Sequence, residues 1–337
     1  MRITQKTLLR IAQDTVNNRV KADRTLLAAY LHGVLVTQDE PLLGGTADID
    51  IVLVHDLDVP APRELIRLTD DVHLDIVHHV RSQYRQPRTL RTDPVYGPLL
   101  YGCKLLHDPR HFIDLTQASV RDQFFAAPNV YARANSFLKA ARDTWFQYQM
   151  EPPTGGLGSV RTYLKAVENA AQAVASMNGA PLSERRMLLD FPKRAAAFGN
   201  PGLTAGLIGL LGGAQVQDTE WDAWLAAWDV TYHALTEVPN APLSLHAERY
   251  PYYRRAFDAL LGSSEPLAVL YPLLNTWLTA CDALPDGHPQ RGSWKLVGDA
   301  LGFTGEALFS RLEALDMYLD AIEELFETWA QANGLDF

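Results

Sequence analysis

The sequence predicts an α+β protein in which a small α/β domain with a mixed sheet precedes an all-α helical bundle. Short apolar runs typical of strands lie before residue 118, whereas apolar residues after it follow a helical period. Residues 1–118 carry 14 basic and 15 acidic side chains, and residues 119–337 carry 16 and 25. All seven tryptophans lie in the second part. We therefore expect two domains, residues 1–118 and residues 119–337.

Helices and strands alternate in the first part. The strands are expected where β-branched residues gather in short apolar runs, and the helices where apolar residues recur every three or four positions. The expected helices span 5–23 and 59–71, and the expected strands span 25–36, 48–55, 72–80 and 103–107. The Leu42-Leu43-Gly44-Gly45-Thr46 segment is typical of a turn.

The second part is expected to be helical throughout. Its predicted helices span 129–149, 158–178, 183–198, 218–235, 250–261, 266–284 and 304–332. In the last of these, apolar residues from Leu308 to Trp329 alternate steps of four and three, which is a heptad seam. Thr304 and Gly334 fit its two caps. The seam predicts a bundle core, with a homodimer contact as the alternative.

Composition excludes several classes of protein. With 30 basic and 40 acidic residues the chain has a net charge of −10, which argues against a general nucleic-acid or anionic-membrane binder. Its two cysteines, Cys103 and Cys281, are expected to be buried thiols in a reducing compartment. The most apolar stretch, 202–214, is too short to span a bilayer and predicts a buried helix or a loop-to-helix junction. Because the start also lacks a secretory pattern, we expect a soluble cytoplasmic protein.

Three acidic residues stand within apolar strands. Asp48 and Asp50 are two residues apart on one predicted strand, so both carboxylates face the same side. Asp75 lies in the next strongly apolar strand. Like charges beside a buried strand are costly unless a cation holds them, and a divalent metal with oxygen ligands meets that need. The sequence therefore predicts a metal site at Asp48, Asp50 and Asp75.

A resemblance to a known family rests on these residues. Leu31-His32-Gly33-Val34, thirteen further residues and then Asp48-Ile49-Asp50-Ile51 resemble the signature of the DNA polymerase β-like nucleotidyltransferase superfamily. Asp75 fits the family's third acid, and the 101–109 segment is similar to the strand that closes such domains. The likeness covers roughly residues 25–115. The helical part looks like that of aminoglycoside nucleotidyltransferases in architecture only.

The resemblance implies an enzyme that moves an NMP, usually AMP from ATP, to a hydroxyl group with Mg²⁺ as cofactor. Asp48 and Asp50 would bind metal, Asp75 would be a metal ligand or general base, and Gly33 would let backbone approach the phosphates. A position that is usually Ser or Gly holds Val34, so backbone N–H groups and Thr46 would take over its phosphate contact. The implied partners are the nucleotide and a small-molecule acceptor. The alternatives are a catalytically weak nucleotide-binding protein and a protein AMP-transferase.

Further candidates have plainer alternatives. Lys165 and Glu168 share a helix face, where the resemblance implies phosphate and substrate or proton contacts and the alternative is a surface ion pair. Four arginines, Arg81, Arg85, Arg88 and Arg91, could clamp a triphosphate or form a solvated face. The acidic face of the last helix would suit a cationic acceptor or simply face solvent. We interpret the histidines at positions 55, 73, 78 and 79 as polar strand ends rather than a zinc site.

Overall fold

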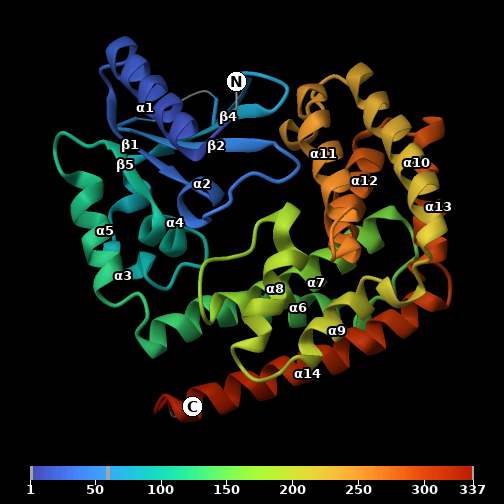
Figure 1. Cartoon of the computed structure of the whole chain (residues 1–337). Helices are drawn as coiled ribbons and strands as arrows, with labels where there is room; N and C mark the ends of the chain where they lie inside the picture. The colour runs from blue at the N-terminus through green and yellow to red at the C-terminus, as the bar shows by residue number, and fades with distance from the viewer. Residues whose placement is uncertain (1–2, 58–60, 336–337) are drawn as a thin grey trace. The chain divides into compact units, whose positions relative to one another are not determined.

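The structure is a computed structural model that describes residues 3–57 and 61–335. It confirms an α+β protein, with one five-stranded mixed sheet and many helices (Figure 1). The chain forms two compact units. The first consists of Met1–Val130 together with Pro251–Ala259, and the second of Tyr131–Tyr250 together with Leu260–Phe337. Position 118, where we expected the division, lies inside α5 (Phe112–Asp122) of the first unit.

The sheet belongs to the first unit and has the strand order β3-β4-β2-β1-β5. The strands are β1 (Leu26–His32), β2 (Ala47–His55), β3 (Arg63–Arg67), β4 (Val72–Val80) and β5 (Lys104–His107). The neighbouring strands β2 and β4 are parallel, and every other pair of neighbouring strands is antiparallel. The expected strands at 48–55, 72–80 and 103–107 are thus confirmed, and the strand expected at 25–36 is shorter.

Each face of the sheet carries its own apolar core. The helix α1 (Gln5–Ala22), which begins at the capping residue Thr4, covers one face with Leu8, Ala12 and Val16 (Figure 1). The odd-numbered residues of β2 point into that core. The even-numbered residues Val52 and Val54 join the opposite core instead. Because side chains alternate along a strand, Asp48 and Asp50 lie on this second face.

Short helices after β4 build the second core. They are the 3-10 turn η1 (Arg81–Tyr84), α3 (Pro87–Leu90), α4 (Tyr96–Gly102) and α5. Their buried side chains include Tyr84, Leu100 and Ile113. Sequence periodicity did not predict η1, α3 and α4, because helices of four to seven residues are too short to show a repeating apolar face. The 11-residue helix α5 was also not predicted.

The prediction of a helix at 59–71 is wrong. The segment forms the edge strand β3, antiparallel to β4, and Val59 and Pro60 lie outside the described residues. β1 also ends earlier than expected, at His32, because Gly33 has a φ of 75° and the chain then enters the one-turn helix α2 (Val34–Thr37).

The second unit is helical. Its helices are α6 (Ala127–Met150, starting in the first unit), α7 (Leu157–Ser176), α8 (Met187–Ala196), α9 (Gly202–Leu210), α10 (Trp221–Ala234), α12 (Leu270–Ala283), α13 (Lys295–Ala300) and α14 (Ala307–Ala332) (Figure 1). The apolar stretch 202–214, expected to be a buried helix or a loop-to-helix junction, contains the short helix α9. The helix α11 (Tyr250–Leu261) supplies residues 251–259 to the first unit.

The heptad seam of α14 lies in the interior of the second unit. Leu308, Leu312, Leu315, Leu319, Ile322 and Phe326 are all buried, as a bundle core requires. Gly334 follows the helix with a φ of 70°, as expected for its end. The expected cap at Thr304 is wrong, because the helix starts after Glu306 and the Thr304 hydroxyl donates to Asp299 instead.

Two smaller expectations are also met. Cys103 and Cys281 are both buried free thiols. Among the residues that the structure describes, no helix combines the length and the apolar character that a membrane crossing requires.

Candidate metal centre

A tight turn leads the chain into β2. Leu43 and Thr46 exchange two backbone hydrogen bonds of 3.2 and 3.1 Å, and the two residues between them have φ values of 62° and 75°. A two-residue turn with positive φ at both positions strongly favours glycine, which Gly44 and Gly45 supply. The turn places Asp48 two residues into the strand that follows.

Three carboxylates converge just beyond this turn. Asp50 of β2 lies opposite Asp75 of β4 in the parallel register, and Asp48 lies two residues before Asp50 on the same face. One ligand oxygen from each of the three lies within 4.8 Å of the others. Asp48 is 3% exposed and Asp75 is 4% exposed. Pairing of β2 with β4 therefore brings together three acids that are up to 27 residues apart in the sequence.

Gly33 packs directly against this cluster. It follows β1, and a Cβ atom added to it would overlap the Oδ2 atom of Asp50. Its positive φ is also a conformation that residues with a side chain rarely adopt. Both constraints explain a glycine here, since the backbone must pass close to a carboxylate.

Arg63 of β3 holds one of the three acids. Its Nε donates to Asp75 Oδ1 at 2.7 Å, and its Nη2 donates to Asp75 Oδ2 at 2.5 Å. Such a two-pronged contact fixes the plane of the carboxylate as well as balancing its charge. Arg63 was not predicted as a site residue, because residues 59–71 were expected to form a helix.

Two histidines border the cluster. His73, fully buried, has its Nδ1 atom 3.7 Å from Asp48 Oδ1. Burial lowers the pKa of His32 to about 4, although the charge of Asp75 acts in the opposite direction. His32 is therefore neutral at physiological pH and adds no positive charge to the site. Strand alternation predicts that His73 shares a face with Asp75, but it indicates no role for this histidine.

The segment from α11 covers the turn end of this region. The hydroxyl of Thr46 donates to the carbonyls of Leu43, at 2.9 Å, and Tyr252, at 3.4 Å. The Tyr252 ring meets the His73 ring edge to face, with centroids 6.3 Å apart. Arg255 forms an ion pair with Asp71, the residue before β4. Thr46 thus stabilises the turn and its contact with α11, and the phosphate contact implied for it stays a prediction.

The donor set fits a hard divalent cation. Mg²⁺ prefers oxygen ligands at about 2.0–2.1 Å, which places neighbouring oxygens roughly 3 Å apart. One oxygen from each of the three carboxylates lies within 4.8 Å of the others, which is close to that spacing. Arg63 balances the charge of one carboxylate. A bound metal ion would offset the repulsion that remains among the three. Asp48, Asp50 and Asp75 could therefore hold a metal ion.

The remaining candidate residues belong to other elements. Lys165 and Glu168 belong to α7 in the second unit, where they form an ion pair of 2.7 Å with each other. Arg81 and Arg85 line a pocket beyond the end of β4. That end lies about 17 Å along the strand from Asp75, at about 3.3 Å per residue.

The histidines at the far end of the sheet form a polar chain. His55 and His78 share a hydrogen bond of 2.9 Å, and His78 contacts Glu64 at 2.7 Å. Glu64 in turn accepts from Arg19 of α1 at 2.6 Å. In the part of the chain that the structure describes, no histidine joins a cluster with metal-ligand geometry.

The acidic face of α14 holds a cation from its own chain. Arg142 of α6 donates to Asp316, Asp320 and Glu323 at distances of 2.5 to 2.8 Å. This arginine is mostly buried, with 13% of its side chain exposed. Part of the negative charge that suggested a cationic acceptor is therefore balanced within the second unit.

Comparison with known proteins identifies no family. No model of a known protein family matches the chain, and no curated protein matches it in sequence.

Proposed function

We propose that the first unit carries a Mg²⁺-dependent nucleotidyltransferase centre of the DNA polymerase β-like type. The observation that supports it is the convergence of Asp48, Asp50 and Asp75 from two parallel strands, within 4.8 Å, beside the backbone of Gly33. Two acids on one strand and a third on its neighbour match the pattern that the sequence resemblance implies.

The reaction would transfer AMP from ATP to a hydroxyl group of a small-molecule acceptor. The acceptor oxygen forms a bond to the α-phosphorus, and the bond from that phosphorus to the oxygen bridging to the β-phosphate breaks. The electron pair leaves with pyrophosphate, and the hydroxyl proton passes to Asp75 or to water. Asp48 and Asp50 would hold the Mg²⁺, whose charge offsets the negative charge of the triphosphate.

Charge supports a small acceptor rather than a nucleic acid. Residues 119–337 carry 25 acidic and 16 basic side chains, a net charge of −9. A polyanion would be repelled by that charge, whereas a neutral or cationic molecule such as an aminoglycoside would not. Because Arg142 occupies three carboxylates of α14, the proposal does not depend on that face as the acceptor site.

Turnover of α-labelled ATP with Mg²⁺ and a panel of hydroxyl acceptors, including aminoglycosides, tests the proposal. Asp48→Asn and Asp50→Asn should each abolish pyrophosphate release. Asp70→Asn is the matched control, because Asp70 is an exposed carboxylate paired with Arg67 outside the cluster. Persistent turnover in both cluster variants would refute the metal assignment.

Two outcomes would change the proposed activity. If ATP binds with Mg²⁺ but no acceptor yields pyrophosphate, the centre binds nucleotide without catalysis. If labelled ATP in a cell lysate marks a protein band only when the wild-type protein is present, the acceptor is a protein.

A further inference from the structure

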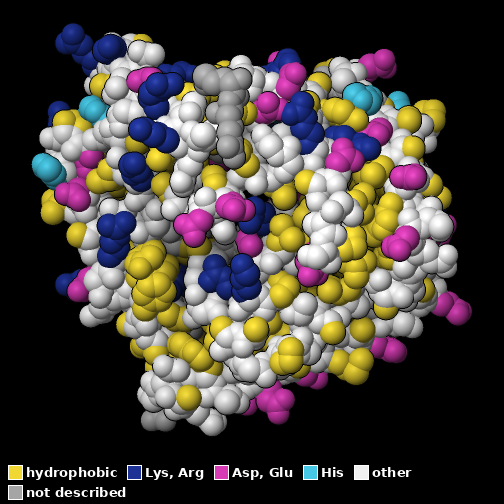
Figure 2. All heavy atoms as spheres, viewed as in Figure 1, with side chains coloured by type: hydrophobic (Ala, Val, Ile, Leu, Met, Phe, Trp, Pro, Cys, Tyr) yellow, Lys and Arg dark blue, Asp and Glu magenta, His cyan; other side chains and the backbone are white. Residues whose placement is uncertain are grey.

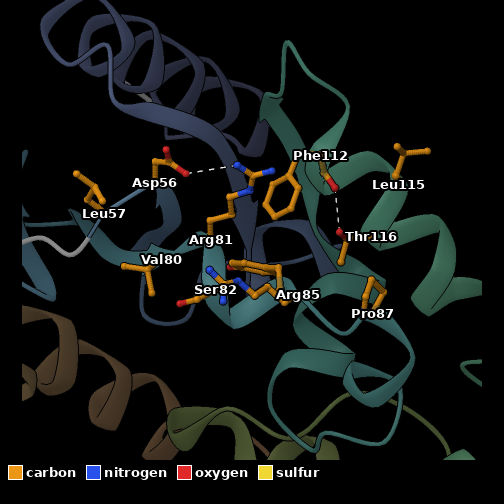
Figure 3. Close-up of a pocket in the computed structure, with 11 residues that line it drawn as sticks. Asp56, Leu57, Val80, Arg81, Ser82, Arg85, Pro87, Phe112, Leu115 and Thr116 are labelled. Carbon is orange, nitrogen blue, oxygen red and sulfur yellow. Dashed lines mark hydrogen bonds and ion pairs between the residues drawn. The ribbon is translucent and has the colours of Figure 1, made fainter.

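A second pocket lies in the first unit, apart from the three carboxylates. Its volume is about 690 Å³, within the range of small-molecule sites. It is formed by the residues that follow β2 and β4 and by the start of α5 (Figure 3). All eleven residues that line it belong to the first unit.

Two guanidinium groups give the pocket its positive charge. Figure 3 shows Arg81 reaching toward Asp56 and Phe112, while Arg85 runs beside Ser82. Arg85 forms no ion pair with any residue in 3–57 or 61–335, and its side chain is exposed. Arg81 lies 3.5 Å from Asp56, and both side chains are more than half exposed. An exposed pair of this kind is weak, so an anion can replace Asp56 at little cost.

Apolar groups complete the wall. The Arg81 guanidinium lies over the Phe112 ring at 5.5 Å from its centroid. Leu57 and Leu115, which are 73% and 69% exposed, add apolar surface to the lining of the pocket. Figure 2 shows basic, acidic and hydrophobic side chains interspersed on the face in view. The pocket therefore offers charge to one end of a ligand and apolar surface to the other.

We propose that this pocket binds a small phosphate monoester that carries a ring or other apolar group. Two arginines favour a phosphate dianion over a singly charged carboxylate, because each guanidinium can donate two hydrogen bonds to phosphate oxygens. Phe112, Leu57 and Leu115 would pack against the apolar group. The site is independent of the proposed nucleotidyl transfer, since it shares no residue with the carboxylate cluster.

Calorimetric titration with phenyl phosphate, in EDTA to exclude metal, tests the proposal. Saturable binding is expected, with weaker binding of inorganic phosphate, phenol and benzoate. Arg85→Gln and Arg81→Gln should each weaken phenyl phosphate by roughly ten- to a hundredfold. Arg88→Gln, on α3 and outside the lining, should change nothing. All three arginines are exposed, and thermal melts followed by circular dichroism confirm folding.

A substitution that should tighten binding, rather than weaken it, provides a second test. Asp56→Asn removes the carboxylate that competes for Arg81, so it should tighten phenyl phosphate by about two- to fivefold. Asp114→Asn changes the net charge equally but lies on α5 outside the lining, so it should have no such effect.

Several results would overturn the proposal. They are the absence of saturable binding, equal affinity for benzoate or inorganic phosphate, and equal losses in Arg88→Gln. Loss of phenyl phosphate binding in an Asp48→Asn/Asp50→Asn variant would place the ligand at the carboxylate cluster and refute a second site. Retained binding in that variant supports the site whether or not ATP turnover occurs.

Discussion

The backbone of Gly33 touches the carboxylate of Asp50, with no room for a Cβ atom between them. This contact couples the end of β1 to the candidate metal centre on β2. It gives Gly33 a role that depends on the packing of Asp50, in addition to any contact with a nucleotide.

Gly33→Ala should therefore abolish Mg²⁺ binding, because the added methyl group pushes Asp50 out of the cluster. Gly45→Ala is a matched control, since Gly45 has the same φ of 75° but open space around its Cβ position. Each variant should lose about 1–3 kcal/mol of stability from the strained backbone. Gly33→Ala should lose more than Gly45→Ala, because its methyl group also overlaps the Asp50 carboxylate. Calorimetric titration with Mg²⁺ should distinguish the two variants, because only Gly33→Ala should lose metal binding. Normal metal binding by Gly33→Ala would contradict the prediction.

Arg63→Gln should change the balance between metal-free and metal-bound protein. Without the guanidinium, the three carboxylates repel one another more strongly, so the melting temperature without metal should fall. Mg²⁺ should then raise the melting temperature more than in wild type, because a ligand that binds the folded state more tightly stabilises it more. Arg67→Gln, on the same strand but paired with the exposed Asp70, is the control. An equal Mg²⁺ response in both variants would argue against a coupling of Arg63 to the site.

Stability should decline as the pH falls from about 6.5 toward 4, in part through His79. Burial, with a smaller contribution from His78, lowers the pKa of His79 to about 4, whereas the unfolded value is about 6.5. The unfolded state thus binds the proton more readily, and this contribution is complete above pH 6.5 and lost on acidification. The Nδ1 atom of His79 and the Tyr84 hydroxyl share a hydrogen bond of 2.5 Å, which ties the ring to this partly buried site.

Chemical denaturation at a series of pH values measures this effect. Between about pH 6.5 and 4, His79→Gln should reduce the slope of the unfolding free energy against pH by on the order of 1 kcal/mol per pH unit. The exposed His233, replaced in the same way, provides the reference variant. A slope that matches wild type in His79→Gln would show that other groups carry the dependence.

Arg142→Gln should destabilise the second unit by about 1–2 kcal/mol, because it leaves three neighbouring carboxylates of α14 unbalanced. The loss should shrink at high salt, which screens their repulsion. Lys139→Gln, on the same helix, breaks only an exposed pair with Asp143 and should cost about 0.5 kcal/mol or less. Equal losses for both variants would mean that the Arg142 contacts contribute no more than an ordinary surface pair.

The carboxylate cluster could be predicted because its signals are local. Asp48 and Asp50 share a face by strand parity alone, and Asp75 lies in a run of apolar residues that is unambiguous as a strand. The sequence alone did not establish which strands are neighbours. The observed parallel pairing of β2 with β4 brings Asp50 opposite Asp75.

Arg63 was missed because β3 has a weak signal. Its five residues contain only two apolar side chains, Leu65 and Ile66, and it lies at the edge of the sheet after a proline-rich segment. Prolines are equally common at the start of a helix, and pairing with β4 decides between the two structures. The contribution of α11 was missed for a related reason. Its helical period is clear, but contacts with residues about 200 positions earlier leave no trace in a local pattern.

The discontinuity of the first unit has a consequence for synthesis on the ribosome. The turn at Gly44 packs against the backbone of Arg255, so this region is completed only after residues 251–259 have been made. At about 5–20 residues per second, the 120 residues from 131 to 250 delay that completion by roughly 6–24 s. During this interval a nascent first unit exposes the turn at Gly44 that α11 will later cover. A minimal form of this unit therefore needs residues 251–259 joined to residues 1–130, because truncation after residue 130 leaves that turn uncovered.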